Sequence, residues 1–200
     1  RIIMKKIFMF LTMFLIFLSN TSKAEDSYMF GGVKVFNYGI ETSDLQVINT
    51  SLVNLGFSSS TSSTDNTGIG FDLGIGLNLD ESIALEFGYV NFGTLEINTT
   101  LTGPAETLKT EIAGSAITGA WVFKFGDDKE NFYLKAGMHS WDMDGKATSS
   151  LGSSTAPLGT GTDLTFGAGY KSGNWFGSYD YYAIDDADLS SFGIGYSTKF

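Results

Sequence analysis

The sequence predicts an all-β protein, an eight-stranded antiparallel up-and-down transmembrane β-barrel preceded by a cleavable signal peptide. Three observations lead to this prediction. An apolar run near the N-terminus has the form of a secretory signal, and apolar residues alternate with period two along the rest of the chain. The segments that connect these stretches are short and long in turn. A length of 200 residues suits one such domain.

Composition excludes several other classes of protein. The chain has no cysteine, which rules out disulfide frameworks and thiolate metal sites, and its 25 glycines argue against a helical bundle. After residue 24 it contains eight basic and 22 acidic residues, a net charge of −14, with no arginine. A nucleic-acid partner requires a basic face and is therefore not expected. We also expect no metal and no cofactor.

Residues 1–24 have the features of a signal peptide. Met4 is the expected start, two lysines follow it, and residues 7–18 form an apolar run of 12 residues. Small residues at Ser22 and Ala24 predict cleavage between Ala24 and Glu25. A transmembrane anchor would need about 20 apolar residues, so that alternative is disfavoured. The barrel domain is expected to cover residues 25–200.

Eight segments alternate between apolar residues and either glycine or polar residues, as β-strands with two different faces do. The clearest is 69–79, where six apolar residues share one face. At the usual tilt, a strand of about 9–11 residues crosses a bilayer. In chain order the predicted strands are 28–36, 69–79, 83–89, 110–125, 132–139, 164–171, 175–184 and 192–200.

The connections differ in length from one end of the predicted barrel to the other. Short turns are expected at 80–82, 126–131 and 172–174. The other connections are mostly long, at 37–66, 99–109 and 144–162, with a short one at 185–190. Serine and threonine runs such as 58–64 predict flexible polar loops.

The alternation also fits a soluble barrel with an apolar interior, but two features favour lipid outside. The second face carries glycine and isolated charges, which fit the narrow lumen of an eight-stranded barrel, and short turns opposite long loops are typical of outer-membrane barrels. Because an open sheet edge is costly in hydrocarbon, strand 28–36 is expected to pair with 192–200.

Aromatic belts are predicted at the two membrane interfaces. They are Phe30, Phe123, Phe125, Phe132, Trp175 and Phe200 on the turn side, and Tyr89, Phe92, Trp141, Tyr182 and Phe192 on the loop side.

Four segments resemble the OmpA-like family of eight-stranded outer-membrane barrels. They are the opening strand 28–35, the turn and strand 80–89, the aromatic-basic-glycine stretch 132–137 and the closing strand 191–200. The resemblance implies a bacterial outer-membrane protein surrounded by lipid. It also implies that the barrel-assembly machinery reads a C-terminal signal, here Tyr196, Thr198 and Phe200. Because the chain stops at Phe200, we do not expect the peptidoglycan-binding domain of longer members. A monomer is expected.

Strand parity places seven charged residues in the lumen: Lys34, Asp72, Glu86, Lys124, Lys135, Asp180 and Lys199. Charges removed from water need partners, so we predict an ion-pair network with Glu86 and Lys135 near its centre. Lys124 is the competing partner for Glu86. A plugged interior that holds the barrel together is favoured over a small gated pore.

No catalytic residues are predicted. His139 is the single histidine, and the neighbouring Ser140 faces the opposite side of the strand, so the two do not form a nucleophile and base. The sequence therefore favours a non-enzymatic outer-membrane protein that contributes to envelope structure, with surface loops available for interactions. A narrow, porin-like solute channel is the first alternative, and a lipid-modifying enzyme is the second.

Overall fold

The structure, a computed structural model, describes residues 27–103, 105–127, 129–184 and 188–199. Residues 1–26 lie outside this part, so it does not describe the expected signal peptide or the Ala24–Glu25 cleavage site. The elements in chain order are β1 (Tyr28–Asn37), α2 (Thr42–Asn54), β2 (Ser59–Thr64), β3 (Thr67–Asn78), β4 (Ile83–Thr102), β5 (Glu106–Gly126), β6 (Glu130–Ser149), β7 (Gly152–Ser172), β8 (Trp175–Tyr182) and β9 (Leu189–Lys199).

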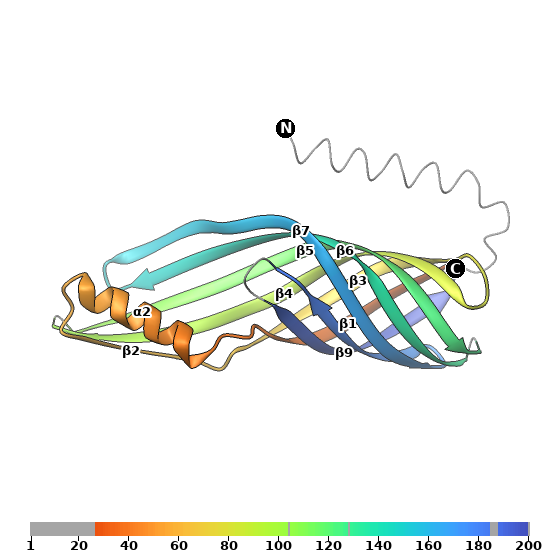
Figure 1. Cartoon of the computed structure of the whole chain (residues 1–200), viewed down its shortest axis with the longest axis horizontal. Coiled ribbons are helices and arrows are strands. Elements are labelled where there is room, and N and C mark those ends of the chain that lie inside the picture. The colour runs from red at the N-terminus through yellow and green to blue at the C-terminus, as the bar shows by residue number, and fades with distance from the viewer. Residues whose placement is uncertain (1–26, 104, 128, 185–187, 200) are drawn as a thin grey trace, which may run out of the picture.

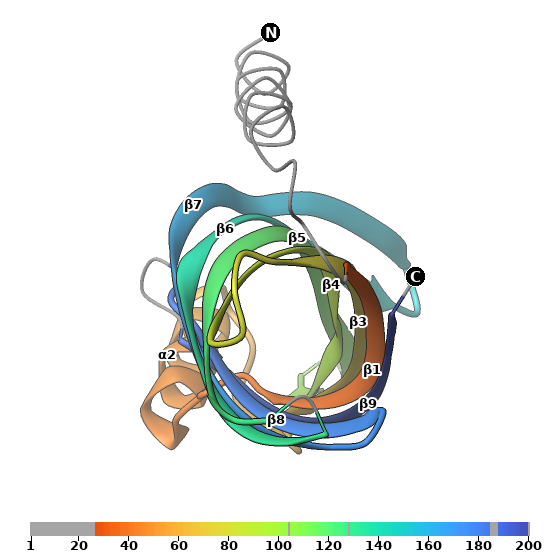
Figure 2. The ribbon, with the colours of Figure 1, turned by 90° about the vertical axis from the view of Figure 1, so that its right-hand side faces the viewer.

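Eight of these strands close into an antiparallel ring in the order β1, β3, β4, β5, β6, β7, β8, β9 (Figure 2). The first and last strands of the ring pair along their whole length, from Tyr28 opposite Lys199 to Asn37 opposite Ser190. This closure satisfies the backbone groups that an open edge would leave unpaired. The predicted eight-stranded up-and-down barrel and its eight strand positions are confirmed. The ninth strand, β2, lies outside the ring and pairs with β4 alone among the described strands.

Aspartate side chains stabilise two of the short turns. Asp80 Oδ1 accepts hydrogen bonds from the backbone N–H groups of Ser82 (2.7 Å) and Ile83 (2.8 Å) before β4. Asp127 does the same for Lys129 and Glu130 before β6, and these bonds hold the pKa of the Asp127 carboxyl below its usual range. We call this end of the barrel, where β3–β4, β5–β6 and β7–β8 connect, the turn end, and the opposite end the loop end.

The outward-facing residues of the barrel form an apolar belt that ends sharply on its loop-end side. On β6 the outward residues are apolar from Phe132 to Met138 and polar from Ser140 to Asp144. On β5 the same change falls between Ile117 and Ser115, and Ile117 lies directly opposite Ser140. The belt therefore ends at one level on neighbouring strands, as expected where hydrocarbon gives way to water.

Large apolar side chains are exposed all around this belt. Exposing so many in one continuous ring would be very unfavourable in water, and lipid removes that cost. Among them are Val33, Val35, Ile69, Phe71, Leu73, Ile117, Trp121, Leu134, Met138, Leu164, Phe166, Phe192 and Ile194, with exposed fractions from 41% for Trp121 to 74% for Ile69. The outer surface is that of a membrane-spanning barrel.

Strands continue well beyond the belt at the loop end. The β4–β5 hairpin remains paired up to Leu101 and Glu106, and the β6–β7 hairpin up to Ser149 and Gly152 (Figure 1). The predictions of loops at 99–109 and 144–162 are therefore largely wrong. The polar run at 58–64 is also not a loop, since its residues from Ser59 onward form β2. β-branched threonine suits strands, and this favours pairing over disorder.

A β-bulge in β4 sets which way the upper residues point. The register between β4 and β5 shifts between Asn91 and Thr94. Below the bulge even-numbered residues of β4 face inward, and above it Leu95, Ile97 and Leu101 do. Gly93 lies in this bulge at φ +76°, and a Cβ there would sit 2.4 Å from the Ile69 carbonyl oxygen, so only glycine fits. The shift turns apolar residues away from water once the strand has left the membrane.

Helix α2 lies beside β2 at the loop end of the molecule, beyond the ends of the shorter strands β1, β8 and β9 (Figure 1). Leu45 and Ile48 pack against the apolar cluster inside the loop end. The Oδ1 atom of Asn49 accepts hydrogen bonds from the Ser60 and Ser62 hydroxyls at 2.9 and 2.8 Å. The prediction of a loop over all of 37–66 therefore missed one helix and one strand. Within the described residues, no helix is long and apolar enough to cross a membrane.

Candidate functional site

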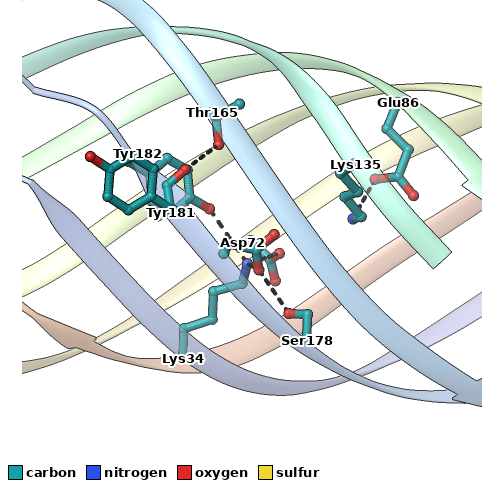
Figure 3. A network of polar contacts seen from close by, with 9 residues as sticks. Lys34, Asp72, Glu86, Lys135, Thr165, Ser178, Tyr181 and Tyr182 are labelled. Carbon is teal, nitrogen blue, oxygen red and sulfur yellow. Dashed lines mark hydrogen bonds and ion pairs between the residues drawn. The ribbon is translucent and has the colours of Figure 1, made fainter. Parts of the chain in front are cut away.

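The inside of the barrel holds the charged and aromatic residues from which any function of the lumen must come. Its first group is centred on Lys34 of β1. The Lys34 ammonium lies 2.6 Å from Asp180 Oδ2 on β8 and 3.0 Å from Asp72 Oδ2 on β3 (Figure 3). The hydroxyl of Ser178 donates to the same Asp180 oxygen at 2.8 Å. All three charged side chains are buried, so the group joins three strands across the lumen.

The second group lies nearer the turn end. Lys135 Nζ on β6 contacts Glu86 Oε2 on β4 at 2.5 Å, and the Tyr28 hydroxyl donates to the other Glu86 oxygen at 2.7 Å. The ammonium of Lys135 also lies 5.2 Å from the ring centroids of both Phe30 and Tyr133. Both Glu86 oxygens are thus bonded, as a carboxylate removed from water requires.

Glycines on the inner face make room for these side chains. A Cβ on Gly167 would lie 2.4 Å from Asp180 Oδ1, and one on Gly193 would lie 2.6 Å from the Cγ atom of Lys34. Larger residues at these positions would displace the charged groups. This explains why the inward row of the sequence alternates glycine with single charges.

An aromatic cluster crosses the lumen at the loop end, above the Lys34 group. Phe36 and Phe92 are fully buried, with ring centroids 5.5 Å apart, and Tyr182 packs against Phe92 at 5.4 Å. Trp141 is buried above them and donates to Asp163 Oδ2 at 2.6 Å. The cluster closes this end of the lumen with apolar side chains.

The predicted aromatic belts are therefore partly wrong. Phe92, Trp141 and Tyr182 are buried inside the loop end, and Phe30 lines the cavities of the lumen. The described residues of the predicted belts that do face outward are Tyr89, Phe123, Phe125, Phe132, Trp175 and Phe192. The alternation along each strand indicates which aromatic residues point inward. Phe36 lies on the same face of β1 as Lys34, and Tyr182 lies on the same face of β8 as Asp180.

Four buried polar atoms in the described lumen have no hydrogen-bond partner: Asp72 Oδ1, Ser191 Oγ and both ring nitrogens of His139. His139 packs edge-on against Tyr182, with ring centroids 5.4 Å apart. Ser140 is exposed on the outer face, so the two residues point to opposite sides of β6. No group of three or more His, Asp or Glu side chains suited to a metal occurs in the described part of the chain.

Small cavities lie inside the barrel, and two of them border the charged groups. One of about 50 Å³ opens at the turn end, and one of about 30 Å³ lies between the Lys34 and Glu86 groups. A buried water needs about 10–15 Å³ of such space, so each cavity has room for only a few waters. Of the loop-end cluster, only Val90 and Tyr182 line either cavity, and both border the smaller one.

The structure divides the seven predicted lumen charges into three sets. Lys34, Asp72 and Asp180 form one buried group, and Glu86 and Lys135 form the other. Lys124 and Lys199 line the turn-end cavity, where Lys124 Nζ lies 2.5 Å from Asn78 Oδ1. Of the predicted assembly signal, Tyr196 is exposed on the outer face, Thr198 lies on the same face, and Phe200 lies outside the described residues.

The sequence argument missed two residues of this region. Lys171 lines the turn-end cavity, and Tyr28 bonds Glu86 at its inner limit. Both lie on the inward parity of their strands, Lys171 in step with Thr165 and Tyr28 in step with Lys34. That signal was present in the sequence.

A closed ring of eight antiparallel strands, an apolar belt outside and a polar interior define a transmembrane β-barrel of the outer-membrane type. No family model matches the chain, and no curated protein matches it. Solved structures with a similar fold include Ail, the attachment invasion locus protein of Yersinia pestis. It is 16% identical, with 86% of this chain and 98% of that chain covered and a TM-score of 0.49.

Two further solved structures are similar. The N-terminal β-barrel domain of Pseudomonas aeruginosa OprF is 14% identical over 87% of this chain and 100% of that chain, with a TM-score of 0.46. Neisserial surface protein A is 13% identical over 88% of this chain and 100% of that chain, with a TM-score of 0.44. Membrane insertion follows from the barrel's own surface.

Proposed function

We propose that this chain is a non-enzymatic integral protein of the bacterial outer membrane that contributes to envelope structure. In this proposal the barrel is a sealed anchor, and the extended sheet with α2 is a rigid surface on the cell exterior. The observation that carries the proposal is the double closure of the lumen, by the Lys34–Asp72–Asp180 group and by the apolar cluster around Phe36 and Phe92.

The alternative of a narrow solute channel has less support. An ion crossing the lumen would have to pass both the buried ion-pair group and a layer of packed aromatic rings. The alternative of a lipid-modifying enzyme has even less support, because His139 is buried in the lumen while lipid lies outside the barrel. A monomer surrounded by lipid, assembled by the barrel-assembly machinery through its C-terminal strand, completes the proposal.

Conductance in a planar lipid bilayer tests the sealed lumen. The purified barrel is expected to show no single-channel steps. A variant that opens both closures, with Phe36→Ala and Phe92→Ala combined with Lys34→Ala, should show small steps, because the apolar layer is thinned and the ion-pair group is broken. Phe71→Ala, Phe166→Ala on the outer face is the matched control and should stay silent. Steady conductance by the unaltered protein would favour the channel instead. A lipid-hydrolysis assay on the same preparation should give no activity.

A further inference from the structure

The Lys34 group is short of one positive charge. Its single ammonium faces two carboxylates, 2.6 Å from Asp180 Oδ2 and 3.0 Å from Asp72 Oδ2, and all three side chains are more than nine-tenths buried. The neighbouring pair of Glu86 and Lys135 is neutral and supplies no compensating charge. A net negative charge held away from water is unfavourable unless a counter-charge joins it.

The two carboxylates of the Lys34 group are not equally well satisfied. Asp180 Oδ2 accepts hydrogen bonds from the Lys34 ammonium and from the Ser178 hydroxyl. Among the described residues, Asp72 contacts Lys34 through Oδ2, and its buried Oδ1 atom has no hydrogen-bond partner. Buried carboxylate oxygens normally have partners, so Asp72 Oδ1 marks the place where a counter-charge is missing.

This oxygen lies beside a cavity. Asp72 Oδ1 sits over Gly32 of β1, where a Cβ would be only 2.9 Å from it. Phe30 and Lys34, on either side of Gly32 along the same face of β1, line the cavity of about 30 Å³ between the two charged groups, and so does Asp72 (Figure 3). The described lining of the cavity holds two lysines and three carboxylates, so the cavity shares the charge deficit of the Lys34 group.

Neutral oxygen atoms complete the polar lining of this cavity. They belong to the hydroxyl groups of Thr118, Thr165 and Tyr182. The Thr165 hydroxyl donates its proton to the Tyr181 carbonyl oxygen at 2.9 Å, so its oxygen lone pairs can face a cation. A set of oxygen ligands suits a hard cation, and the small volume of the cavity favours a small ion.

The charge of such a cation follows from the carboxylates. Lysines already bond Glu86 and Asp180, which leaves one carboxylate oxygen, Asp72 Oδ1, for an ion in the cavity. The described residues contain no group of three acidic side chains suited to a divalent metal. A single positive charge is also what brings the Lys34 group to neutrality.

We propose that the cavity between the two charged groups binds one small alkali-metal cation, of the Na⁺ class, with Asp72 Oδ1 as its charged ligand. The hydroxyl oxygens of Thr118, Thr165 and Tyr182 surround the ion. It enters from the turn end, since Glu86 and Lys135 border both this cavity and the turn-end cavity, whereas the aromatic cluster closes the loop end.

Urea unfolding of the full barrel assembled in lipid vesicles tests this proposal. N-methylglucamine chloride is exchanged stepwise for sodium chloride at constant ionic strength. Once sodium exceeds its dissociation constant, each further tenfold increase should raise the unfolding midpoint by about 0.5–1 M urea. A midpoint that does not change with sodium would overturn the proposal, because water alone would then fill the cavity.

Asp72→Asn is the variant that removes the charged ligand. It should abolish the sodium response, and its midpoint in N-methylglucamine chloride should equal or exceed that of the unaltered protein because the excess negative charge is gone. Asp163→Asn is the matched control, since Asp163 also points inward but bonds Trp141 and lies outside the lining of this cavity. It should keep the full response. An equal sodium response in Asp72→Asn would overturn the proposal.

Infrared spectroscopy with isotope-labelled aspartate reads the site in the unaltered protein. The difference spectrum between sodium and N-methylglucamine should show a shifted carboxylate band, because Asp72 is ionised and its Oδ1 gains or loses the ion. A carboxylic acid band in the N-methylglucamine salt that disappears only as pH rises, with no effect of sodium, would overturn the proposal. In that case a proton, and not a metal cation, supplies the missing charge.

Discussion

Lys135 Nζ and Glu86 Oε2 lie 2.5 Å apart across the lumen, on strands separated by β5. A single unpaired charge is unfavourable both in a dry protein interior and in lipid. The contact explains why two charged residues are nevertheless found in the membrane-spanning parts of β4 and β6. Each residue neutralises the other, and Tyr28 bonds the remaining carboxylate oxygen. Breaking one side of such a pair leaves the other charge buried and unpaired.

Replacing Glu86 with Gln should therefore destabilise the barrel, by roughly 3–5 kcal/mol if the site is dry and less if water enters. The double replacement Glu86→Gln, Lys135→Met should recover much of that loss. Urea unfolding in lipid vesicles measures both. The same cycle with Lys124→Met is the control, because Lys124 contacts Asn78. An unchanged midpoint for Glu86→Gln would mean that the pair contributes nothing to stability.

Gly93 offers a test of the bulge in β4. Gly93→Ala adds a Cβ that collides with the Ile69 backbone at a positive φ. We therefore expect the left-handed backbone penalty of about 1–2 kcal/mol plus about 1–3 kcal/mol from the collision, and a lower yield of folded barrel. Gly173→Ala is the matched control, since Gly173 also has a positive φ but no atom within 4 Å of its Cβ position. It should cost only the left-handed backbone penalty, about 1–2 kcal/mol. Equal folding yields for the two variants would contradict the close approach at Gly93.

The tips of the two long hairpins are joined by one carboxylate. Glu106 Oε1 and Oε2 accept hydrogen bonds from the Ser150 backbone N–H and hydroxyl, both at 2.7 Å, and these bonds lower the pKa of Glu106. A lowered pKa means that the link is intact at neutral pH and is lost as pH falls through the folded-state value. NMR titration should place the Glu106 pKa below 4.5, and Ser150→Ala should raise it partway. A Glu106 pKa at 4.5 or above in the unaltered protein would show that the link does not form.

Much of the fold can be predicted from the sequence, because lipid on one side and the lumen on the other impose a strict alternation of apolar with glycine or polar residues along each strand. The eight strand positions and the closure of β1 on β9 follow from that pattern. The loop-end structure does not follow from that pattern, because beyond the membrane apolar residues point inward and not outward. Leu95 and Ile97 do so, and the Gly93 bulge has changed which residues of β4 face inward, from even-numbered to odd-numbered. Helix α2 also went unpredicted, since Leu45 and Ile48 give only a weak helical periodicity among polar residues.

The lumen shows the same division. Parity identified the charged residues, but which of them meet depends on how the ring closes, and no local pattern states that Asp180 and Asp72 approach Lys34 from either side. The inward aromatics were assigned to the membrane interfaces because aromatic residues near strand ends suit both environments. Counting parity from Lys34 to Phe30 and from Asp180 to Tyr182 would have placed these two aromatic residues inside the barrel.

Deleting Phe200 tests the proposed assembly signal. We expect less assembled barrel in the membrane fraction, with little change in the unfolding midpoint of the barrel that does assemble, because the effect is on recognition and not on packing. Heat-dependent gel mobility, comparing unboiled with boiled samples, gives the folded fraction. Lys199→Gln, one position earlier on the inward parity, is the control and should assemble normally. Full assembly without Phe200 would contradict the signal role.

The central claim is that lipid surrounds the barrel while the loop-end aromatic residues point inward, and the three tryptophans test it directly. Trp121 and Trp175 face outward with 41% and 63% of their surface exposed, whereas Trp141 is buried inside the loop end. Single-tryptophan variants, made by Trp→Phe replacement of the other two, can be inserted into vesicles of bromine-labelled lipid. Strong fluorescence quenching of Trp121 and Trp175 with little quenching of Trp141 is the predicted result. Quenching of none of them, or of Trp141 alone, would contradict a barrel with lipid outside.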